Sequence, residues 1–157
     1  SLGGRVTRTK VGDVFVAEAA TREAVVFGGE PSGAWIWPDE TLCPDGSLAA
    51  AKLTALVAAE GSLAEQVASV TTYPIQRRSI EVDDKTAVME RVAEKLRDAY
   101  DDVTTIDGVR VSTADGWVLV RPSGTQPLIR ITAEAETENA ADDLLVATVD
   151  SVEAARE

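Results

Sequence analysis

Between residues 127 and 135 apolar and polar side chains alternate, which predicts a strand with one face in a core and the other face polar. The apolar positions are Ile129, Ile131, Ala133 and Ala135, and the other face carries Leu128, Arg130, Thr132 and Glu134. Shorter strands are predicted at residues 75–82, 103–106, 109–113 and 117–121. The dipeptides Asp107-Gly108 and Asp115-Gly116 are strong hairpin signals, so the strands on either side of them are expected to pair antiparallel.

A helical period of 3.6 residues appears on both sides of these strands. Residues 84–100 predict a helix with Val88, Val92, Leu96 and Ala99 on one face. Residues 138–155 predict another, which would bury Ala141, Leu145, Val149 and Val152. The resulting order, β-α-β-β-β-α, is typical of a compact antiparallel sheet that two helices cover on one side.

The N-terminal half has a different pattern, in which helices alternate with little strand. Helices are predicted at residues 12–20 and at 46–60, the second capped by Asp45 and ended by Gly61. A third, to residue 70, would begin with a capping box of Ser62 and Glu65. One apolar strand, 24–27, precedes Gly28-Gly29. Because no complete sheet is visible, residues 1–72 are expected to be the end of an α/β domain, and residues 73–157 a separate α+β domain.

Composition excludes several classes of protein and of site. The 157 residues are 45% hydrophobic and 27% charged, as in folded globular proteins. No apolar run approaches the roughly 20 residues that span a bilayer and no leader is visible, so we expect a cytoplasmic protein without a membrane partner. The single cysteine, Cys43, excludes an internal disulfide, and the absence of histidine excludes Ser-His-Asp and Cys-His catalysis within this chain.

The net charge of −12 repels polyanions, so nucleic acid is not an expected partner. The acidic excess, with arginine commoner than lysine, suggests a high-salt cytoplasm in which the repulsion is screened. A merely acidic protein from an ordinary cytoplasm fits the composition equally well.

The most informative motif is the run RPSGT at residues 121–125. A guanidinium matches two phosphate oxygens at once, the two hydroxyls add donors, and glycine lets main-chain N–H groups approach an anion. The motif therefore predicts a phosphate site. A plain β-turn between two strands is the alternative, since Pro-Ser-Gly is common turn chemistry.

A second polar loop is GGEPSG at residues 28–33. A carboxylate beside a hydroxyl can hold vicinal sugar hydroxyls, and loops at strand ends are frequent ligand positions. The loop is neither a dinucleotide fingerprint nor a P-loop, and a wide turn with a solvated Glu30 is the alternative. Trp35 and Trp37 follow on one side of a strand, where packing is favoured over stacking on a sugar.

Taken together, the two loops show a family resemblance. TKVGD at 9–13, GGEPSG at 28–33 and RPSGTQP at 121–127 resemble, in order and spacing, the last third of the α-D-phosphohexomutases. The family includes phosphoglucosamine mutase, phosphomannomutase and phosphoglucomutase. The resemblance implies that the first domain is the end of the family's α/β domain 3, and that the second is its domain 4, with a TATA-binding-protein-like fold.

The resemblance also implies roles for particular residues. Sugar hydroxyls would be held by Glu30, Ser32 and Gly33, and the substrate's non-reacting phosphate by Arg121, Ser123, Gly124 and Thr125. Lys10 lies in a loop that the family turns toward its active cleft. Two positions depart from the family pattern: Ala34 replaces a frequent histidine, which leaves substrate identity open, and Gln126 replaces a frequent glutamate, which removes a negative charge beside the anion.

The family's reaction passes a phosphoryl group from a phosphoserine to a hexose phosphate through a hexose 1,6-bisphosphate, with Mg²⁺ held by an Asp-rich loop. Neither the phosphoserine loop nor the Asp-rich loop occurs in this sequence, so it is expected to hold no catalytic residue and no metal site. It is therefore interpreted as a fragment, inactive alone, that binds substrate for missing N-terminal domains, with glucosamine phosphate the preferred expectation. A free-standing sugar-phosphate binding module is the alternative.

Overall fold

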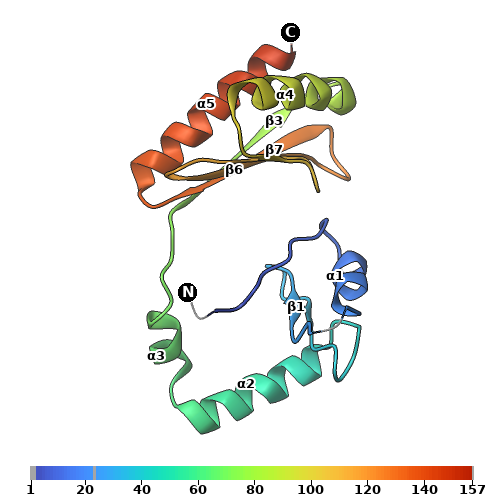
Figure 1. Cartoon of the computed structure of the whole chain (residues 1–157), viewed down its shortest axis with the longest axis vertical. Coiled ribbons are helices and arrows are strands. Elements are labelled where there is room, and N and C mark those ends of the chain that lie inside the picture. Colours follow the sequence, from blue (N-terminus) through green and yellow to red (C-terminus); the bar gives the residue numbers. More distant parts are fainter. Residues whose placement is uncertain (1–2, 23, 157) are drawn as a thin grey trace. The chain divides into compact units, whose positions relative to one another are not determined.

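A computed structural model describes residues 3–22 and 24–156 of the chain (Figure 1). Its contacts divide the chain into two compact units, Ser1–Thr71 (unit 1) and Thr72–Glu157 (unit 2). Residues 1, 2, 23 and 157, which the expected domains include, lie outside the described part. Within the described ranges, no helix is long and apolar enough to cross a bilayer.

Unit 2 is built on a five-stranded antiparallel sheet with the strand order β3-β7-β6-β5-β4. Its elements are β3 (Ile75–Glu81), α4 (Lys85–Ala99), β4 (Val103–Thr104), β5 (Val109–Ser112), β6 (Gly116–Pro122), β7 (Leu128–Ala135) and α5 (Glu138–Arg156). Every strand and helix predicted in this half therefore forms. Counting the short β4, the order is β-α-β-β-β-β-α, one strand more than the expected order.

Helices α4 and α5 cover one face of this sheet, and the core lies between (Figure 1). The alternation predicted for β7 is confirmed, because Ile129, Ile131, Ala133 and Ala135 are all buried. The face of α4 is confirmed at Val88, Val92 and Leu96, which are buried, whereas the predicted Ala99, at the end of the helix, is exposed. On α5 the buried residues are Ala141, Thr148, Val152 and Ala155, and the expected Leu145 and Val149 pack against the core while partly exposed.

Both predicted hairpin turns depend on glycine. Gly108, between β4 and β5, has a φ of 81°, in the left-handed region that glycine favours. A Cβ there would collide with the carbonyl oxygen of Val120, and a Cβ at Gly116 would collide with that of Glu134. The close approach of neighbouring backbones explains why Asp-Gly stands at both turns.

Unit 1 contains α1 (Asp13–Ala20), β1 (Gly28–Gly29), β2 (Trp35–Ile36), α2 (Gly46–Glu60) and α3 (Leu63–Ala68). The cap of α2 is confirmed, since the Asp45 side chain accepts hydrogen bonds from two amides of its first turn. The predicted strand at 24–27 is wrong, because the only strand residues here are the two glycines after it. Ala24 has a φ of 67°, which breaks an extended chain at its first residue.

The capping box predicted for α3 is also wrong. The Ser62 side chain makes no cap hydrogen bond, and the amide of Gln66 bonds instead to the Ser62 carbonyl oxygen. The helix itself is short, ending at Ala68. The first turn of this helix is therefore closed by a backbone hydrogen bond, without a side-chain cap.

The core of unit 1 is small. Its buried residues are Val16, Ala20 and Ile36, with Ala17 and Val25 partly buried around them. Along α2 only Ala49 is buried, and the large apolar side chain of Leu56 is 40% exposed. Most of the surface of α2 is thus without packing partners in the described residues.

Candidate functional site

The predicted phosphate residues lie where β6 ends and the chain turns into β7. Backbone bonds close this turn: the Ser123 amide donates to the Leu128 carbonyl oxygen at 2.9 Å, and the Leu128 amide to that of Gln126 at 2.9 Å. Ser123 is only 5% exposed, whereas Gly124 and Thr125 lie at the surface. We call residues 123–127, the predicted phosphate-binding segment, the phosphate loop.

Three amides of the phosphate loop have no hydrogen-bond partner among the described residues. They are those of Gly124, Thr125 and Gln126. By contrast, the carbonyl oxygens of Ser123 and Gln126 accept bonds from Lys85, and that of Pro127 accepts one from the Val82 amide at 3.0 Å. Successive unpaired amides on an exposed turn form a ready anion site, as in backbone nests.

Arg121 is held in place beside the phosphate loop. Its Nη1 atom lies 3.1 Å from Oδ2 of Asp107, in the turn between β4 and β5, and both side chains are partly exposed at 27% and 32%. The sequence identified Asp107 only as a hairpin residue. The ion pair orients the guanidinium and neutralises part of its charge.

Sequence reasoning missed two further arginines on the same face of the sheet. Arg130 on β7 stands directly opposite Arg121 on β6, and Arg77 on β3 stands opposite Thr132. These two arginines and Arg121 line a depression of about 340 Å³. We call Arg77, Arg121 and Arg130 the arginine cluster. Like charges directly opposite each other are unfavourable in a sheet, and a bound anion would relieve the repulsion.

The alternation along β7 already placed Arg130 on the polar face, and this was the one sequence signal that could have indicated Arg130 as a site residue. What the sequence lacked was the register that sets Arg130 against Arg121. The Nη2 atom of Arg130 also donates to Oε1 of Gln126 at 3.2 Å, so the loop residue that departs from the family pattern contacts the cluster. A neutral amide at this position leaves the charge of Arg130 in place.

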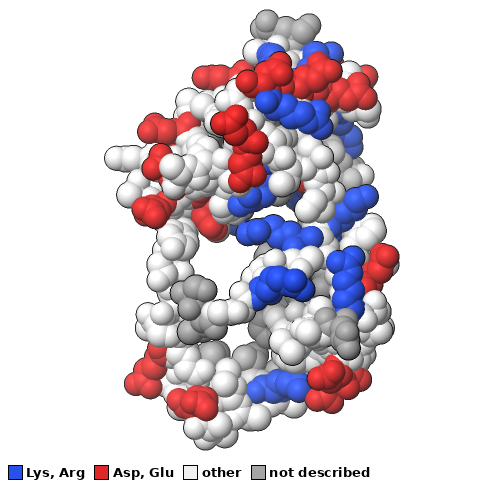
Figure 2. Space-filling view, viewed as in Figure 1, with Lys and Arg blue, Asp and Glu red and all other residues white. Residues whose placement is uncertain are grey.

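Basic side chains gather along the side of the sheet of unit 2 that the helices leave uncovered, whereas acidic and basic side chains are mixed over the helical layer (Figure 2). The chain as a whole carries −12. The arginine cluster is therefore a local basic site on an acidic protein, which favours a small anion over a polyanion.

The predicted sugar residues of unit 1 form the turn between β1 and β2. The Gly33 amide donates to the Glu30 carbonyl oxygen at 3.0 Å, and the Glu30 amide to that of Ala34 at 3.1 Å. Oε1 of Glu30 accepts a hydrogen bond from the Gly12 amide at 2.8 Å, while Ser32 is exposed. The structure thus joins the TKVGD and GGEPSG segments through one carboxylate.

The remaining candidate side chains of unit 1 have neighbours of their own. Lys10 is exposed, and its Nζ atom lies 5.8 Å from the centre of the Phe15 ring. Trp35 and Trp37 pack with Phe27, with ring centres 5.3 to 6.5 Å apart. This aromatic cluster agrees with the packing role that the sequence favoured.

No group of three or more metal-ligating side chains occurs in residues 3–22 and 24–156. The acidic residue at the start of α4, Asp84, caps that helix by accepting from the Thr86 and Ala87 amides at 3.0 Å. The residues present do not fit a magnesium site, so no step of chemistry is assigned to a metal in this chain.

Comparison with known families agrees with this geometry. Residues 1–73 match the model of the phosphoglucomutase/phosphomannomutase α/β/α domain III, and residues 79–151 match the model of that family's C-terminal domain. The chain belongs to the phosphoglucomutase/phosphomannomutase family. Within this phosphohexomutase family it corresponds to the C-terminal portion.

Curated relatives carry the name "probable phosphoglucosamine mutase". The protein of Methanopyrus kandleri is 55% identical over 96% of this chain and 34% of its own length. The protein of Pyrococcus horikoshii is 43% identical over 92% of this chain and 33% of its own length. These relatives are archaeal. The chain spans about a third of the length of the relatives that it matches.

Solved structures share the fold. A Burkholderia thailandensis phosphoglucomutase/phosphomannomutase family protein superposes with a TM-score of 0.79 at 23% identity, over 94% of this chain and 32% of that one. An Aspergillus fumigatus N-acetylphosphoglucosamine mutase, in complex with GlcNAc-6P and magnesium, gives a TM-score of 0.53 at 20% identity, over 74% of this chain and 22% of that one. The mixed α/β architecture is therefore that of the phosphohexomutases.

Proposed function

We propose that the chain is the substrate-binding C-terminal part of a phosphoglucosamine mutase, which interconverts hexose 6-phosphate and hexose 1-phosphate by phosphoserine-mediated transfer. The observation that carries this proposal is the phosphate loop, in which three unpaired amides adjoin an oriented arginine. The substrate class comes from the names of the relatives. Residues 1–72 would be the end of domain 3 and residues 73–157 domain 4.

In this proposal unit 2 holds the phosphate that does not react. The guanidinium of Arg121, the hydroxyls of Ser123 and Thr125 and the free amides of Gly124 and Thr125 bind its oxygens. Charge-assisted hydrogen bonds of this kind are roughly twice as strong as neutral ones, and several together fix orientation. Orientation matters because phosphoryl transfer is accelerated mainly by positioning and by neutralising spreading charge.

Unit 1 would hold the sugar ring. The Gly12 amide fixes one oxygen of Glu30, so that the carboxylate is oriented before substrate arrives. Glu30, Ser32 and Gly33 would bind ring hydroxyls, and Lys10 would contact the active cleft. A carboxylate that is already bonded loses less conformational entropy when it binds a ligand.

The chemical step would belong to N-terminal domains of the same protein. They would supply the phosphoserine and the Mg²⁺ site, with a hexose 1,6-bisphosphate as the intermediate, and the present chain alone would be inactive. The alternative of a free-standing sugar-phosphate binding module, the cytoplasmic location and the high-salt adaptation stay predictions.

The proposal is tested by amide-shift mapping of the chain during titration with glucosamine 6-phosphate. The amides of residues 121–126 should move and saturate. Arg121→Ala should weaken binding by about 2 kcal/mol or more, the scale of a lost charge-assisted bond. The matched control is Arg97→Ala, which removes the same charge from an exposed residue of α4.

In the full-length enzyme Arg121→Ala should lower kcat/KM by several kcal/mol of transition-state free energy, on the order of a lost buried charge contact. Near wild-type turnover in that variant would refute the phosphate assignment. Unmoved phosphate-loop amides in the titration would do the same. If the chain binds glucosamine 6-phosphate and its coding sequence has no phosphoserine loop or Asp-rich loop upstream, the free-standing binding module would be favoured.

A further inference from the structure

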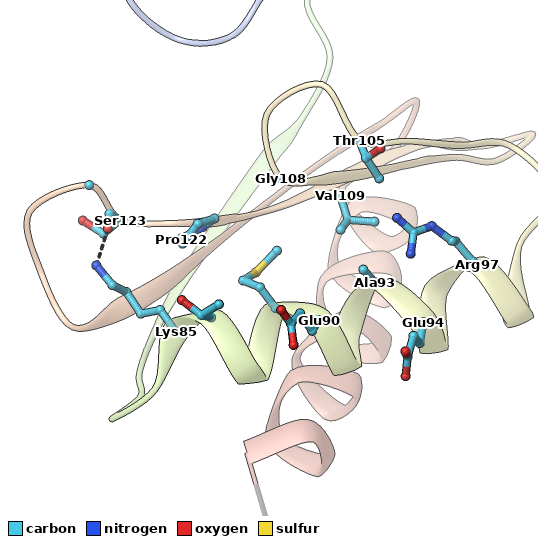
Figure 3. A pocket seen from close by; sticks show the side chains of 13 residues that line it. Lys85, Glu90, Ala93, Glu94, Arg97, Thr105, Gly108, Val109, Pro122 and Ser123 are labelled. Carbon is cyan, nitrogen blue, oxygen red and sulfur yellow. Dashed lines mark hydrogen bonds between the residues drawn. The ribbon is translucent and has the colours of Figure 1, made fainter.

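We infer that Lys85 is a positioning residue of the phosphate loop: its ammonium group orients the Gly124 amide toward the substrate phosphate without contacting the phosphate itself. The inference rests on the proposed function, and it assigns a role to a residue on another element. Figure 3 shows Lys85 beneath the loop, with its hydrogen bond to Ser123 drawn as a dashed line.

The geometry of the bond sets the direction of one amide. The Nζ atom of Lys85 donates to the Ser123 carbonyl oxygen at 2.7 Å. That oxygen and the Gly124 N–H belong to one planar peptide group, and no cis peptide bond occurs among the described residues. In a trans peptide the C=O and N–H point in opposite directions, so the Gly124 N–H points away from Lys85.

The second bond anchors the far end of the loop. Nζ also donates to the Gln126 carbonyl oxygen at 3.0 Å. The peptide group that carries this oxygen continues into Pro127, which has no N–H, so this bond orients no further donor toward the anion. One ammonium group therefore holds both ends of the segment that contains Gly124 and Thr125.

Lys85 is itself well fixed. It is the first residue of α4, directly after the N-cap Asp84, and its side chain lies at one end of a groove of about 680 Å³ along the helix. The groove is lined by apolar groups such as Met89, Val109 and Pro122, with Arg97 near the other end (Figure 3). A lysine stem packs well along such a surface while its charged head meets polar atoms.

Removing the ammonium would free the Ser123 peptide to rotate. Its carbonyl oxygen would then have no partner among the described residues, and one outcome is that it turns outward, presenting a negative dipole to the phosphate. Because glycine follows, such a peptide flip meets little steric resistance. The predicted effect is a loss of phosphate affinity with the sheet intact.

The test compares Lys85→Met with Lys95→Met in the 157-residue chain at constant ionic strength. Lys95 is an exposed lysine of the same helix, so its variant has the same change of charge. Each protein is titrated with glucosamine 6-phosphate and with inorganic phosphate, while amide shifts and the thermal midpoint are recorded. We expect Lys85→Met to raise both dissociation constants about tenfold or more, as for a lost bond to a charged group, and Lys95→Met to change them less than about twofold.

A conservative variant separates positioning from stability. Lys85→Arg keeps a cation with several donors and should recover most of the affinity. The amides of β3 and β7 should keep their wild-type shifts in Lys85→Met, while that of Gly124 moves even without ligand. If Lys85→Met does not fold, Lys85→Leu, which is also neutral and has no donor, replaces it.

Wild-type affinity in the folded neutral variant would overturn the role of Lys85 and leave the proposed function standing. Equal losses for Lys85→Met and Lys95→Met would overturn it too, since the effect would then be one of charge alone. If instead the wild-type chain binds neither probe, the proposed function fails, and the inference fails with it.

Discussion

The two units of this chain are stabilised to very different extents. In unit 2 a five-stranded sheet buries one face under two helices, and its core includes Val111, Val118, Ile129 and Ile131. In unit 1 a hairpin of two-residue strands and helix α1 bury only Val16, Ala20 and Ile36 among the described residues. The phosphate loop is therefore supported by a large packed core, and the turn of residues 28–33, which we call the sugar loop after its proposed role, by a small one.

The exposed apolar surface of unit 1 points to the reason for this difference. Several of its large apolar side chains are well exposed, among them Val6, Val14, Val26, Phe27 and Val67. Soluble proteins rarely leave apolar groups exposed in contiguous patches unless something binds there. Since residues 1–73 match domain III of a family whose members are about three times as long, we expect the rest of that domain to cover them.

The largest expected effect comes from separating the units. Residues 72–157 expressed alone should fold cooperatively, because their core needs no residue of unit 1. Residues 1–71 alone should not, because a core cluster of three buried side chains cannot offset the chain entropy of a segment of this length. Thermal unfolding and the dispersion of amide shifts measure both outcomes, and a cooperative transition in residues 1–71 would contradict the comparison.

The next effect compares two isoleucines that are both fully buried. Ile131→Ala should lower the unfolding free energy of unit 2 by about 2–5 kcal/mol, because it leaves a cavity in the sheet core. Ile36→Ala should leave that transition unchanged, because Ile36 belongs to the separate core of unit 1. Denaturant titration followed at Trp117, the tryptophan of unit 2, would show whether the two cores are independent; a loss for Ile36→Ala would mean that they are not.

A smaller effect concerns the sugar loop. Glu30→Gln keeps the shape but weakens the bonds that a carboxylate makes to the Gly12 amide and to sugar hydroxyls. In the proposed full-length mutase, discrimination between glucosamine, glucose and mannose phosphates should fall by about 1–3 kcal/mol in relative kcat/KM. Binding of inorganic phosphate to unit 2 should not change, and unaltered selectivity would count against the role of Glu30.

The smallest effect concerns the departure from the family pattern in the phosphate loop. Gln126→Glu would convert the bond to Arg130 into an ion pair and place a negative charge beside the anion. Phosphate affinity should fall by about 0.5–1 kcal/mol, a modest amount because the site is exposed and screened. Isothermal titration at low and high salt would measure it, and the deficit should shrink as salt rises.

Local features of unit 2 were predictable from the sequence. The alternation of β7 follows from the two-residue period of a strand, and the Asp-Gly turns follow from the backbone conformations that glycine permits. The cap at Asp84, like that at Asp45 in unit 1, follows from the preference of short carboxylate side chains for free helix amides. In unit 1 the same rules failed at residues 24–27, where an apolar run did not become a strand because the backbone turns at Ala24.

By itself the sequence determined which segments are helices and strands in unit 2 and which two loops carry polar chemistry, because those depend on neighbours along the chain. Only the tertiary structure decided what surrounds each loop. Arg130 opposes Arg121 through a strand register, Glu30 meets Gly12 across 18 positions, and Lys85 reaches Ser123 across 38. Such contacts depend on how whole elements pack, and no local period or motif contains that information.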